Sequence, residues 1–510
     1  MNACLYSGLL PLWEGFDEPF HYAYVETLWQ THRFPVLGRA LAPADIDESF
    51  PLAPVSHVVA RWIPQADTYD AWTLLPQAEK ERRRNELDQL KADPRDSPRP
   101  NYEAHHPPLA YAVLAPADRL MQGAPITVRV LILRLCSGVI SVVFVYLGAV
   151  ALFRELELPE PYANAGLFTI FCSQMLYATI AHVANDWLAV GLSALFLASL
   201  AGFARKPDQR SALMTGLLLG AGLLTKAYFL VFALLALATA ANLLWRKRTA
   251  IKVLLAGAIP ALVLAAPWYT RNLILYGNIS GTYEEFDGIG IRQALAATPR
   301  MNWPATAAFL ARGSLWTGNN SFTDFSKTTM NIVLVLLLLA LSAWVFHRRA
   351  IKTPERVTCA AIVLFSIAVA YASCASFADR KGDVAGASPW YTQVLLVPAI
   401  ALAFLGLSRW RMFGSVLAAC TVAIWTWILV ATWTIKLFPM YSGGGDAPMH
   451  IRDVREWYLH GARAHAHDLS LLALAPASFL YAGLLVSLTL SLFLSASVIR
   501  SLRARSGPQH

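Results

Sequence analysis

Long apolar runs separated by short basic segments are the main pattern of this chain. Runs long enough to cross about 30 Å of hydrocarbon lie near residues 131–153, 162–184, 187–204, 211–245, 251–270, 329–346, 357–377, 390–408, 411–437 and 471–499. The run 211–245 is too long for one helix, because about 35 residues at 1.5 Å each would extend roughly 50 Å. Basic segments flank it on both sides, so it is expected to cross twice, with Lys226 at the turn. The pattern predicts an all-α integral membrane protein with about 11–12 transmembrane helices.

Composition supports a membrane protein. Hydrophobic residues make up 56% of the 510 positions and charged residues 15%, and the mean hydropathy is +0.45, well above that of a soluble domain. The six cysteines show no paired spacing, unlike a disulfide or zinc framework. The net charge of +9 would suggest nucleic acid in a soluble protein. Here the basic residues cluster at the ends of apolar runs, so the charge is an orientation signal and no nucleic-acid partner is expected.

The basic segments define the expected orientation. "HRRAIKTPER", "SRWR" and "RSLRARS" fall on the cytoplasmic side, and the net acidic "RELELPEP" is the exception. The expected division is a truncated or partial first transmembrane helix at 1–13, a first extracytoplasmic loop at 14–125, a transmembrane core at 126–270, a second extracytoplasmic loop at 271–328, and C-terminal transmembrane helices at 329–510 with a short outer loop at 378–389 and a longer one at 438–470. Residues 1–13 would extend only about 20 Å as a helix, so a true start upstream is expected. In the first loop, the charged stretch "EKERRRNELDQLKADPRDSPRP" predicts a solvated helix followed by a turn.

Polar residues recur at the outer ends of the predicted spans. Ionisable groups at membrane depth usually face a cavity and carry function. The candidates are Asp17, Glu18 and His21 in "GFDEPFHYAYV", His105 and His106 in "NYEAHHPPLAY", Asn185 and Asp186 in "HVANDW", Lys226, and Arg271 and Tyr276 in "WYTRNLILYGN". Each motif alone also has a structural explanation, because an acid pair before Pro19, a His pair before Pro-Pro and an Asn-Asp pair can all be helix starts or caps.

Together these groups suit transfer from a lipid-linked donor whose leaving group is a phosphate. A carboxylate can take the proton of an acceptor hydroxyl as it attacks the anomeric carbon of a sugar. Cations nearby can stabilise the charge that grows on the departing phosphate. A lipid donor also explains a site at a membrane surface, since the tail stays in the bilayer while the head group reaches the loops.

"FDEPFHYAYV" resembles the Asp-Glu motif in the first external loop of the GT-C superfamily, the multi-spanning glycosyltransferases that use polyprenyl-phosphate sugars. This superfamily includes the protein mannosyltransferases and the lipid A aminoarabinose transferases. The resemblance continues through "AHHPPLAYAVLAP", "AHVANDWLAVGLSALFLASL", "GLLLGAGLLTKAYFLV" and "PWYTRNLILYGN", over about residues 15–280. It implies a GT-C-like helical bundle whose external loops carry short juxtamembrane helices, in a bacterial inner membrane with the site on the extracytoplasmic face.

The resemblance also implies roles for single residues. Asp17 matches the catalytic general base, and Glu18 matches its partner, which helps to shape a substrate pocket. Lys226 matches a lysine near the donor phosphate, and Arg271 is assigned to the phosphate as well. His105 and His106 occupy a region that presents polar groups to the donor. "GASPWYTQ" departs from the family pattern, because it lacks the arginine that many relatives show before the corresponding tyrosine. Residue order does not decide which acid of the pair is the base.

No metal is assigned from the sequence. Oligosaccharyl transferases of the wider superfamily use a divalent ion, whereas enzymes with monophosphate donors generally rely on protein cations. No spaced His/Asp/Glu cluster forces a metal site. A divalent metal is therefore compatible with the sequence but not required by it.

Two alternatives stay open. A secondary transporter would place ionisable residues near the middle of spans and use broken helices; the outer position of the candidates disfavours it, while Pro260 and Pro267 in one span favour it. A flippase or O-antigen ligase would also handle polyprenyl lipids. The absence of a GxGxxG strand-turn-helix unit argues against direct use of a nucleotide sugar. The sugar is not determined, nor is the acceptor, which is a lipid, a protein or a glycan.

Overall fold

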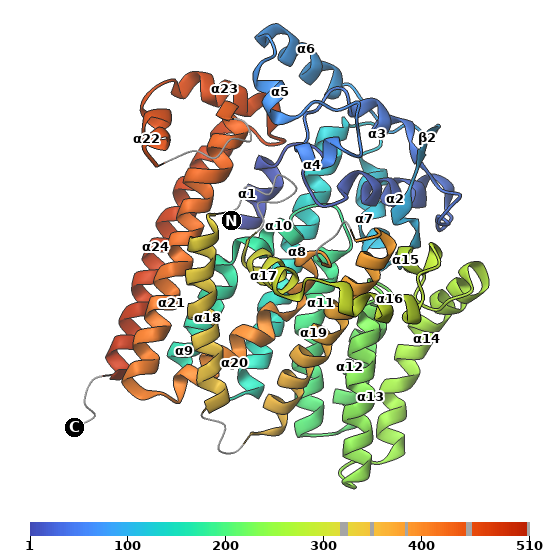
Figure 1. The fold of residues 1–510 in the computed structure, drawn as a ribbon, viewed down its shortest axis with the longest axis vertical. Coiled ribbons are helices and arrows are strands. Elements are labelled where there is room, and N and C mark those ends of the chain that lie inside the picture. Colours follow the sequence, from blue (N-terminus) through green and yellow to red (C-terminus); the bar gives the residue numbers. More distant parts are fainter. Residues whose placement is uncertain (317–324, 347–350, 383–385, 445–450, 507–510) are drawn as a thin grey trace.

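The computed structural model describes residues 1–316, 325–346, 351–382, 386–444 and 451–506. Within these residues the regular secondary structure is almost entirely helical, with a single two-stranded antiparallel sheet. The long helices run side by side as a bundle, and the N-terminal segments cover its upper end (Figure 1). The prediction of an all-α membrane protein is therefore confirmed.

Eight helical segments of the described residues are long and apolar enough to cross a membrane. They are α8 (Ile126–Glu155), α11 (Asp186–Arg205), α14 (Ile251–Tyr276), α18 (Lys327–Phe346), α19 (Thr353–Asp379), η4 with α20 (Pro389–Leu395 and Leu396–Ser408), α21 with its π-helical extensions η5 and η6 (Arg411–Ala431, Thr432–Leu437 and Met440–Gly444), and α24 (Ala477–Ser506). Shorter apolar helices lie among them: α1 (Asn2–Leu9), α9 (Glu160–Cys172), α10 (Gln174–Ile180), α12 (Gln209–Leu223) and α13 (Phe229–Trp245).

Three of the apolar runs test the expected helix boundaries. The run 211–245 folds into two helices, α12 and α13, with Lys226 in the turn between them, as predicted. The run 162–184 was expected to be one span, and this is wrong, because the chain is extended at Ser173 and a second helix starts at Gln174. Side chains compensate the break, since the Gln174 amide donates to the Cys172 carbonyl at 2.9 Å. α14 passes through Pro260 and Pro267 without interruption, so the broken helix that favoured a transporter is absent there.

The short basic segments meet at one end of the bundle, the lower end in Figure 1. Arg205 pairs with Glu155 at 2.7 Å, the Lys352 ammonium pairs with Glu157, and Arg248 donates to the Arg205 carbonyl at 3.1 Å. Arg205, Arg248 and Lys352 therefore share one end of the bundle, and the cytoplasmic orientation of that end stays a prediction. The acidic segment that departed from the rule supplies the carboxylates for these ion pairs.

The opposite end is built mainly from the first loop. Its elements are α2 (Glu18–Thr31), β1 (Leu41–Pro43), α3 (Ala44–Ser49), α4 (His57–Ala60), α5 (Tyr69–Thr73), α6 (Gln77–Leu87), β2 (Asp96–Pro100), η1 (Tyr102–His105) and α7 (Leu109–Leu120). Short later elements complete the chain: α15 (Tyr283–Phe286), α16 (Ile291–Ala297), η2 (Thr298–Arg300), α17 (Trp303–Leu315), α22 (Ile451–Leu459) and α23 (Ala462–Leu472). α6 confirms the helix predicted in the charged stretch, whereas the pairing of β1 with β2 was not expected.

A buried arginine at the start of α8 ties these layers together. The Arg129 guanidinium is fully buried and donates to Asp118 of α7 at 2.7 Å. It also lies 3.3 Å from the carboxylates of Glu26 in α2 and Asp45 in α3. Burial raises the pKa of Asp45 to about 7, with Arg129 opposing the shift and Asp118 adding to it. One cation therefore holds three acidic groups where the first loop meets the bundle.

Candidate functional site

Asp17 lies directly before α2 in an unusual backbone conformation. Its φ of 54° and ψ of 19° are left-handed, which is uncommon for a residue other than glycine. It occupies the N-cap position, but its side chain makes no capping hydrogen bond. The Tyr102 hydroxyl donates to the Asp17 carboxylate at 2.7 Å instead. A helix cap therefore explains the position of Asp17 but not the orientation of its carboxylate.

The surroundings make the Asp17 carboxyl more basic than usual. Asp17 is exposed to solvent, yet protein atoms around it raise its pKa to about 6, chiefly by desolvation and then through the charge of Glu103. The Tyr102 hydrogen bond and the positive charges of Lys226 and Arg380 oppose this rise. The carboxyl is therefore still mainly ionised at pH 7.

Lys226 and Asp186 form a buried ion pair beside this carboxyl. The Lys226 ammonium donates to both Asp186 oxygens, at 2.7 and 2.6 Å. Lys226 lies in the turn between α12 and α13, and Asp186 lies in the first turn of α11, where the helix dipole favours a negative charge. The ammonium also lies 4.7 Å from the centre of the Tyr391 ring and 5.4 Å from that of Tyr228. Asn185, next to Asp186, is fully buried, and its side-chain amide has no hydrogen-bond partner among the described residues.

Three histidines gather around Glu103. The Nε2 atom of His106 is 2.7 Å from Oε2 of Glu103, and Nδ1 of His21 is 3.7 Å from the same oxygen. Nδ1 of His21 is also 2.8 Å from the Tyr111 hydroxyl. The ligand atoms of His21, Glu103 and His106 lie within 4.8 Å of one another. Nδ1 of His105 contacts the Tyr102 carbonyl at 2.8 Å, so that nitrogen carries the proton.

Burial controls the charges of this cluster. It lowers the pKa of His105 and of His106 to about 3 and lowers that of His21 well below its usual value. It raises the pKa of Glu103 to about 7, with His105 and Lys226 opposing the rise. The imidazole rings of these three histidines are therefore neutral near pH 7, and their contact with a substrate stays a prediction.

The predicted residues come from five separate segments, and six residues from four of these segments lie in one group: Asp17, His21, His105, His106, Asp186 and Lys226. The charge of Lys226 acts on Asp17, on Glu103 and on His106, so these side chains share one electrostatic environment. Glu103 was missed by the sequence analysis. Its spacing of three residues from His106 in "YEAHHPP" was the available signal, because a 3₁₀ turn brings such residues together.

Glu18 faces away from this group, toward α8. It is fully buried, and the Arg134 guanidinium binds both of its oxygens, with Nε at 2.7 Å. The Val183 amide donates to the same carboxylate at 2.9 Å. Although burial opposes it, the charge of Arg134 lowers the pKa of Glu18, so the pair stays ionised. The contacts of Glu18 thus anchor the first residue of α2, directly after Asp17.

Arg271 and Tyr276 lie on the last turns of α14, which extends beyond the span expected from the sequence. Arg271 Nη2 donates to the Pro35 carbonyl at 2.7 Å, and the guanidinium lies over the ring of Trp268. Nη1 of Arg271 is buried and has no hydrogen-bond partner among the described residues. The Tyr276 hydroxyl accepts from the Leu37 amide at 3.1 Å. Both residues hold the segment after α2.

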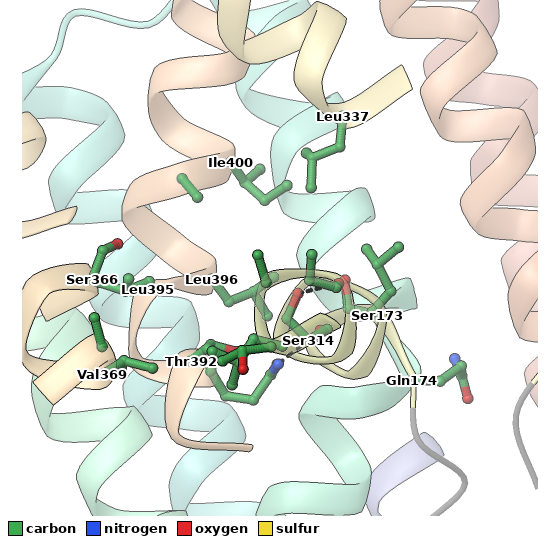
Figure 2. Close-up of a pocket in the computed structure, with 18 of the residues that line it drawn as sticks. Ser173, Gln174, Ser314, Leu337, Ser366, Val369, Thr392, Leu395, Leu396 and Ile400 are labelled. Carbon is green, nitrogen blue, oxygen red and sulfur yellow. Dashed lines mark hydrogen bonds between the residues drawn. The ribbon is translucent and has the colours of Figure 1, made fainter. Parts of the chain in front are cut away.

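A mainly apolar cavity of about 460 Å³ lies deeper in the bundle. Figure 2 shows side chains of α17, α19, η4 and α20 around it, with polar groups at Ser173, Ser314 and Thr392. Thr392 directly follows Tyr391, which contacts Lys226. Trp390 stacks on Phe16 at 4.0 Å, beside Asp17. The segment "SPWYT", which departs from the GT-C pattern in the sequence, therefore lies between the polar group and the cavity.

Comparisons with known proteins bear on the family and the fold. A family described as "Predicted membrane protein (DUF2142)" matches residues 4–391. The chain belongs to this DUF2142 family. No curated protein matches it. Among solved structures, ArnT from Cupriavidus metallidurans bound to undecaprenyl phosphate aligns over 95% of this chain and 74% of that one, with 14% identity and a TM-score of 0.44. A likeness at this level carries no information on activity.

In this DUF2142 protein, the matched segment contains every residue of the polar group, from Asp17 to Lys226. The group offers a basic carboxylate that water can reach, an ammonium ion held in place by an acid, and neutral imidazoles around a buried carboxyl. In general, a carboxylate of raised pKa can accept a proton, and a positioned ammonium ion can bind an anion.

Proposed function

We propose that this protein is a membrane glycosyltransferase that moves a sugar from a polyprenyl-phosphate donor to an acceptor hydroxyl. The expected location is the extracytoplasmic face of a bacterial inner membrane. The observation that supports this most is the meeting of Asp17 and Lys226, which lie far apart in the sequence and act on each other electrostatically at the end of the bundle opposite the basic segments.

In the proposed reaction, Asp17 is the general base. Its carboxylate accepts the proton of the acceptor hydroxyl while the hydroxyl oxygen forms a bond to the anomeric carbon. The bond from that carbon to the phosphate oxygen breaks, and its electron pair leaves on the phosphate. A pKa of about 6 keeps the carboxylate ionised at neutral pH and gives it more basicity than an ordinary aspartate has.

Lys226 is the proposed cation for the leaving phosphate. Asp186 holds the Lys226 ammonium in place before the donor arrives, and the phosphate would then share this ammonium with Asp186. Arg271 contributes Nη1, the buried guanidinium nitrogen that lacks a hydrogen-bond partner among the described residues. Arg271 lies close enough to Tyr24 to act on its hydroxyl, which donates to the His106 carbonyl.

Glu18 has a positioning role in this proposal. Its ion pair with Arg134 fixes the start of α2 and so supports the left-handed backbone of Asp17. His21, His105, His106, Asn185 and Asp186 surround the space where the sugar would bind. The apolar cavity below Tyr391 suits part of the hydrocarbon of a lipid substrate.

The test begins with a deletion strain, because an accumulated under-glycosylated lipid or glycan identifies the acceptor and the missing sugar. Purified protein in proteoliposomes is then assayed with that acceptor and the matching polyprenyl-phosphate sugar. Asp17→Asn should insert and fold normally but lose at least about a hundredfold in turnover. Asp96→Asn is the matched control, since Asp96 is an exposed carboxylate of the same loop. Normal turnover by Asp17→Asn would show that Asp17 is not the base.

A further inference from the structure

Glu103 is a buried carboxylate whose surroundings lack a direct positive partner. Its Oε2 atom lies 2.7 Å from Nε2 of His106, yet this oxygen accepts no hydrogen bond from the described residues. Lys226, the nearby cation, is bound by both oxygens of Asp186. A buried negative charge without a partner is costly, and a cation bound at this oxygen would compensate that charge.

We propose that His21, Glu103 and His106 bind one divalent metal ion, and that Zn²⁺ is the ion that this set of ligands favours. Two imidazole nitrogens and one carboxylate oxygen form a three-ligand Zn²⁺ site that leaves a fourth position open. Mg²⁺ and Ca²⁺ prefer ligand sets made only of oxygen. This site does not depend on the proposed glycosyl transfer, since its evidence is the ligand geometry.

The three ligands need only small movements to close on a metal. Zn²⁺ binds nitrogen and oxygen at about 2.0–2.2 Å, so tetrahedral ligand atoms lie roughly 3.4 Å apart. The three ligand atoms already lie within 4.8 Å of one another, with separations of 2.7 and 3.7 Å to the shared oxygen. Side-chain rotations that move the ligand atoms by about 1 Å would bring them to that geometry. Nδ1 of His21 would exchange its contact with the Tyr111 hydroxyl for the metal.

A buried asparagine fixes the two segments that carry the ligands. The side-chain oxygen of Asn101 accepts a hydrogen bond from the Glu103 backbone amide at 3.0 Å, and its side-chain nitrogen donates one to the Phe20 carbonyl at 3.1 Å. It therefore joins η1, which carries Glu103, to α2, which carries His21. Buried hydrogen bonds behind the ligands are typical of metal sites and help to orient them.

The balance of charge around the cluster also favours a cation. The carboxylates of Asp186 and Glu284 act on Glu103 together with Lys226, and Asp17 lies beside them with Arg380. When all four carboxyls are ionised, these groups carry four negative and two positive charges, and a divalent ion would neutralise the set. Aromatic rings complete the enclosure, since Tyr111 stacks on both Tyr24 and His21.

The test measures metal binding by the full chain in detergent. The protein is stripped with EDTA, incubated with Zn²⁺ and desalted, and its Zn²⁺ content is measured by mass spectrometry, with affinity from calorimetry. We expect one Zn²⁺ per chain, and none in Glu103→Gln or His106→Ala. Asn101→Ala, which removes a positioning residue, should weaken binding about 10- to 100-fold. Tyr111→Phe keeps all three ligands and should still bind one Zn²⁺.

The matched control is the exposed pair of Glu456 on α22 and His460 directly after it, whose side chains lie 3.1 Å apart. His460→Ala should bind Zn²⁺ like the unaltered protein. Zn²⁺ should also raise the unfolding temperature of the unaltered protein and of Tyr111→Phe, but not that of Glu103→Gln. The proposal is overturned if the stripped protein takes up no Zn²⁺, or if Glu103→Gln and His106→Ala both keep one equivalent.

Discussion

Lys226 gives two of its ammonium protons to Asp186, at 2.7 and 2.6 Å, inside a region that excludes most water. The pair joins the turn between α12 and α13 to the first turn of α11. Such a pair affects the stability of the fold as well as any function, because removing one residue leaves the charge of the other buried without compensation. Experiments on Lys226 must therefore separate loss of stability from loss of phosphate binding.

A double substitution makes this separation. Lys226→Met or Asp186→Leu alone leaves one buried charge without its partner and should lower the free energy of unfolding by about 3–5 kcal/mol. The double variant removes both charges and should recover most of that loss, while sugar transfer stays absent. Thermal unfolding in detergent and the proteoliposome assay measure the two effects. A double variant with normal transfer would remove Lys226 from the mechanism.

The Glu18–Arg134 pair should show the same sensitivity. Arg134 is fully buried in α8 and also donates to the Leu10 and Pro11 carbonyls, the second at 2.9 Å. Arg134→Met should therefore destabilise the protein by about 3–5 kcal/mol. The control is Lys352→Met, since the pair of Lys352 and Glu157 is exposed and screened by solvent, so its loss should change stability little. Equal unfolding temperatures for the two variants would contradict this prediction.

Hydropathy could predict where most helices lie, but not which charged groups pair or which titratable groups are ionised. The apolar runs and basic flanks were enough to place Lys226 in a turn and to set one end of the bundle, because these features depend on local sequence. Arg134 sits inside an apolar run, and its partner Glu18 lies far away in the sequence, so their pairing required the fold. The charge of His105 and His106 could not be predicted either, because burial lowers the pKa of both residues and the sequence does not show burial.

The break at Ser173 has a similar cause. An apolar run of sufficient length predicts one span, but the run does not show which backbone carbonyls the side chains of Ser173 and Gln174 will satisfy. Glu103 was overlooked because its role appears only when η1 packs against α2. Local patterns therefore identified most of the residues of the site, and the tertiary contacts determined how they combine.

Close packing of α12 on α14 gives a further prediction. A methyl group on Gly216 would lie 2.0 Å from the Gly257 carbonyl oxygen, so one helix would have to move. Gly216→Ala should lower the free energy of unfolding by about 1–3 kcal/mol, despite the better helix propensity of alanine. Gly123→Ala is the control, since nothing lies within 4 Å of its added carbon. If the two variants have the same free energy of unfolding, the predicted effect of the close contact between α12 and α14 is wrong.

The carboxylates around Arg129 predict a dependence of stability on pH. The pKa of Asp45 rises from its ordinary value of 3.8 to about 7 on folding, so between these values the folded protein binds more protons than the unfolded chain. The free energy of unfolding must then fall as pH rises through this window, by up to about 4 kcal/mol for a single group. Above pH 7 both states are ionised and the loss is complete.

Asp45→Asn removes this titration and keeps a similar shape. The variant should differ little from the unaltered protein at pH 4 and become the more stable of the two at pH 8, with the difference growing between these values. Thermal unfolding across this range measures it, and Asp96→Asn, at an exposed site, should show no such trend. If Asp45 instead contributed mainly an attraction to Arg129, its pKa would fall on folding, and the variant would be the less stable protein at pH 8. The sign of the difference therefore tells whether desolvation or ion pairing dominates at this junction of α8 with the first loop.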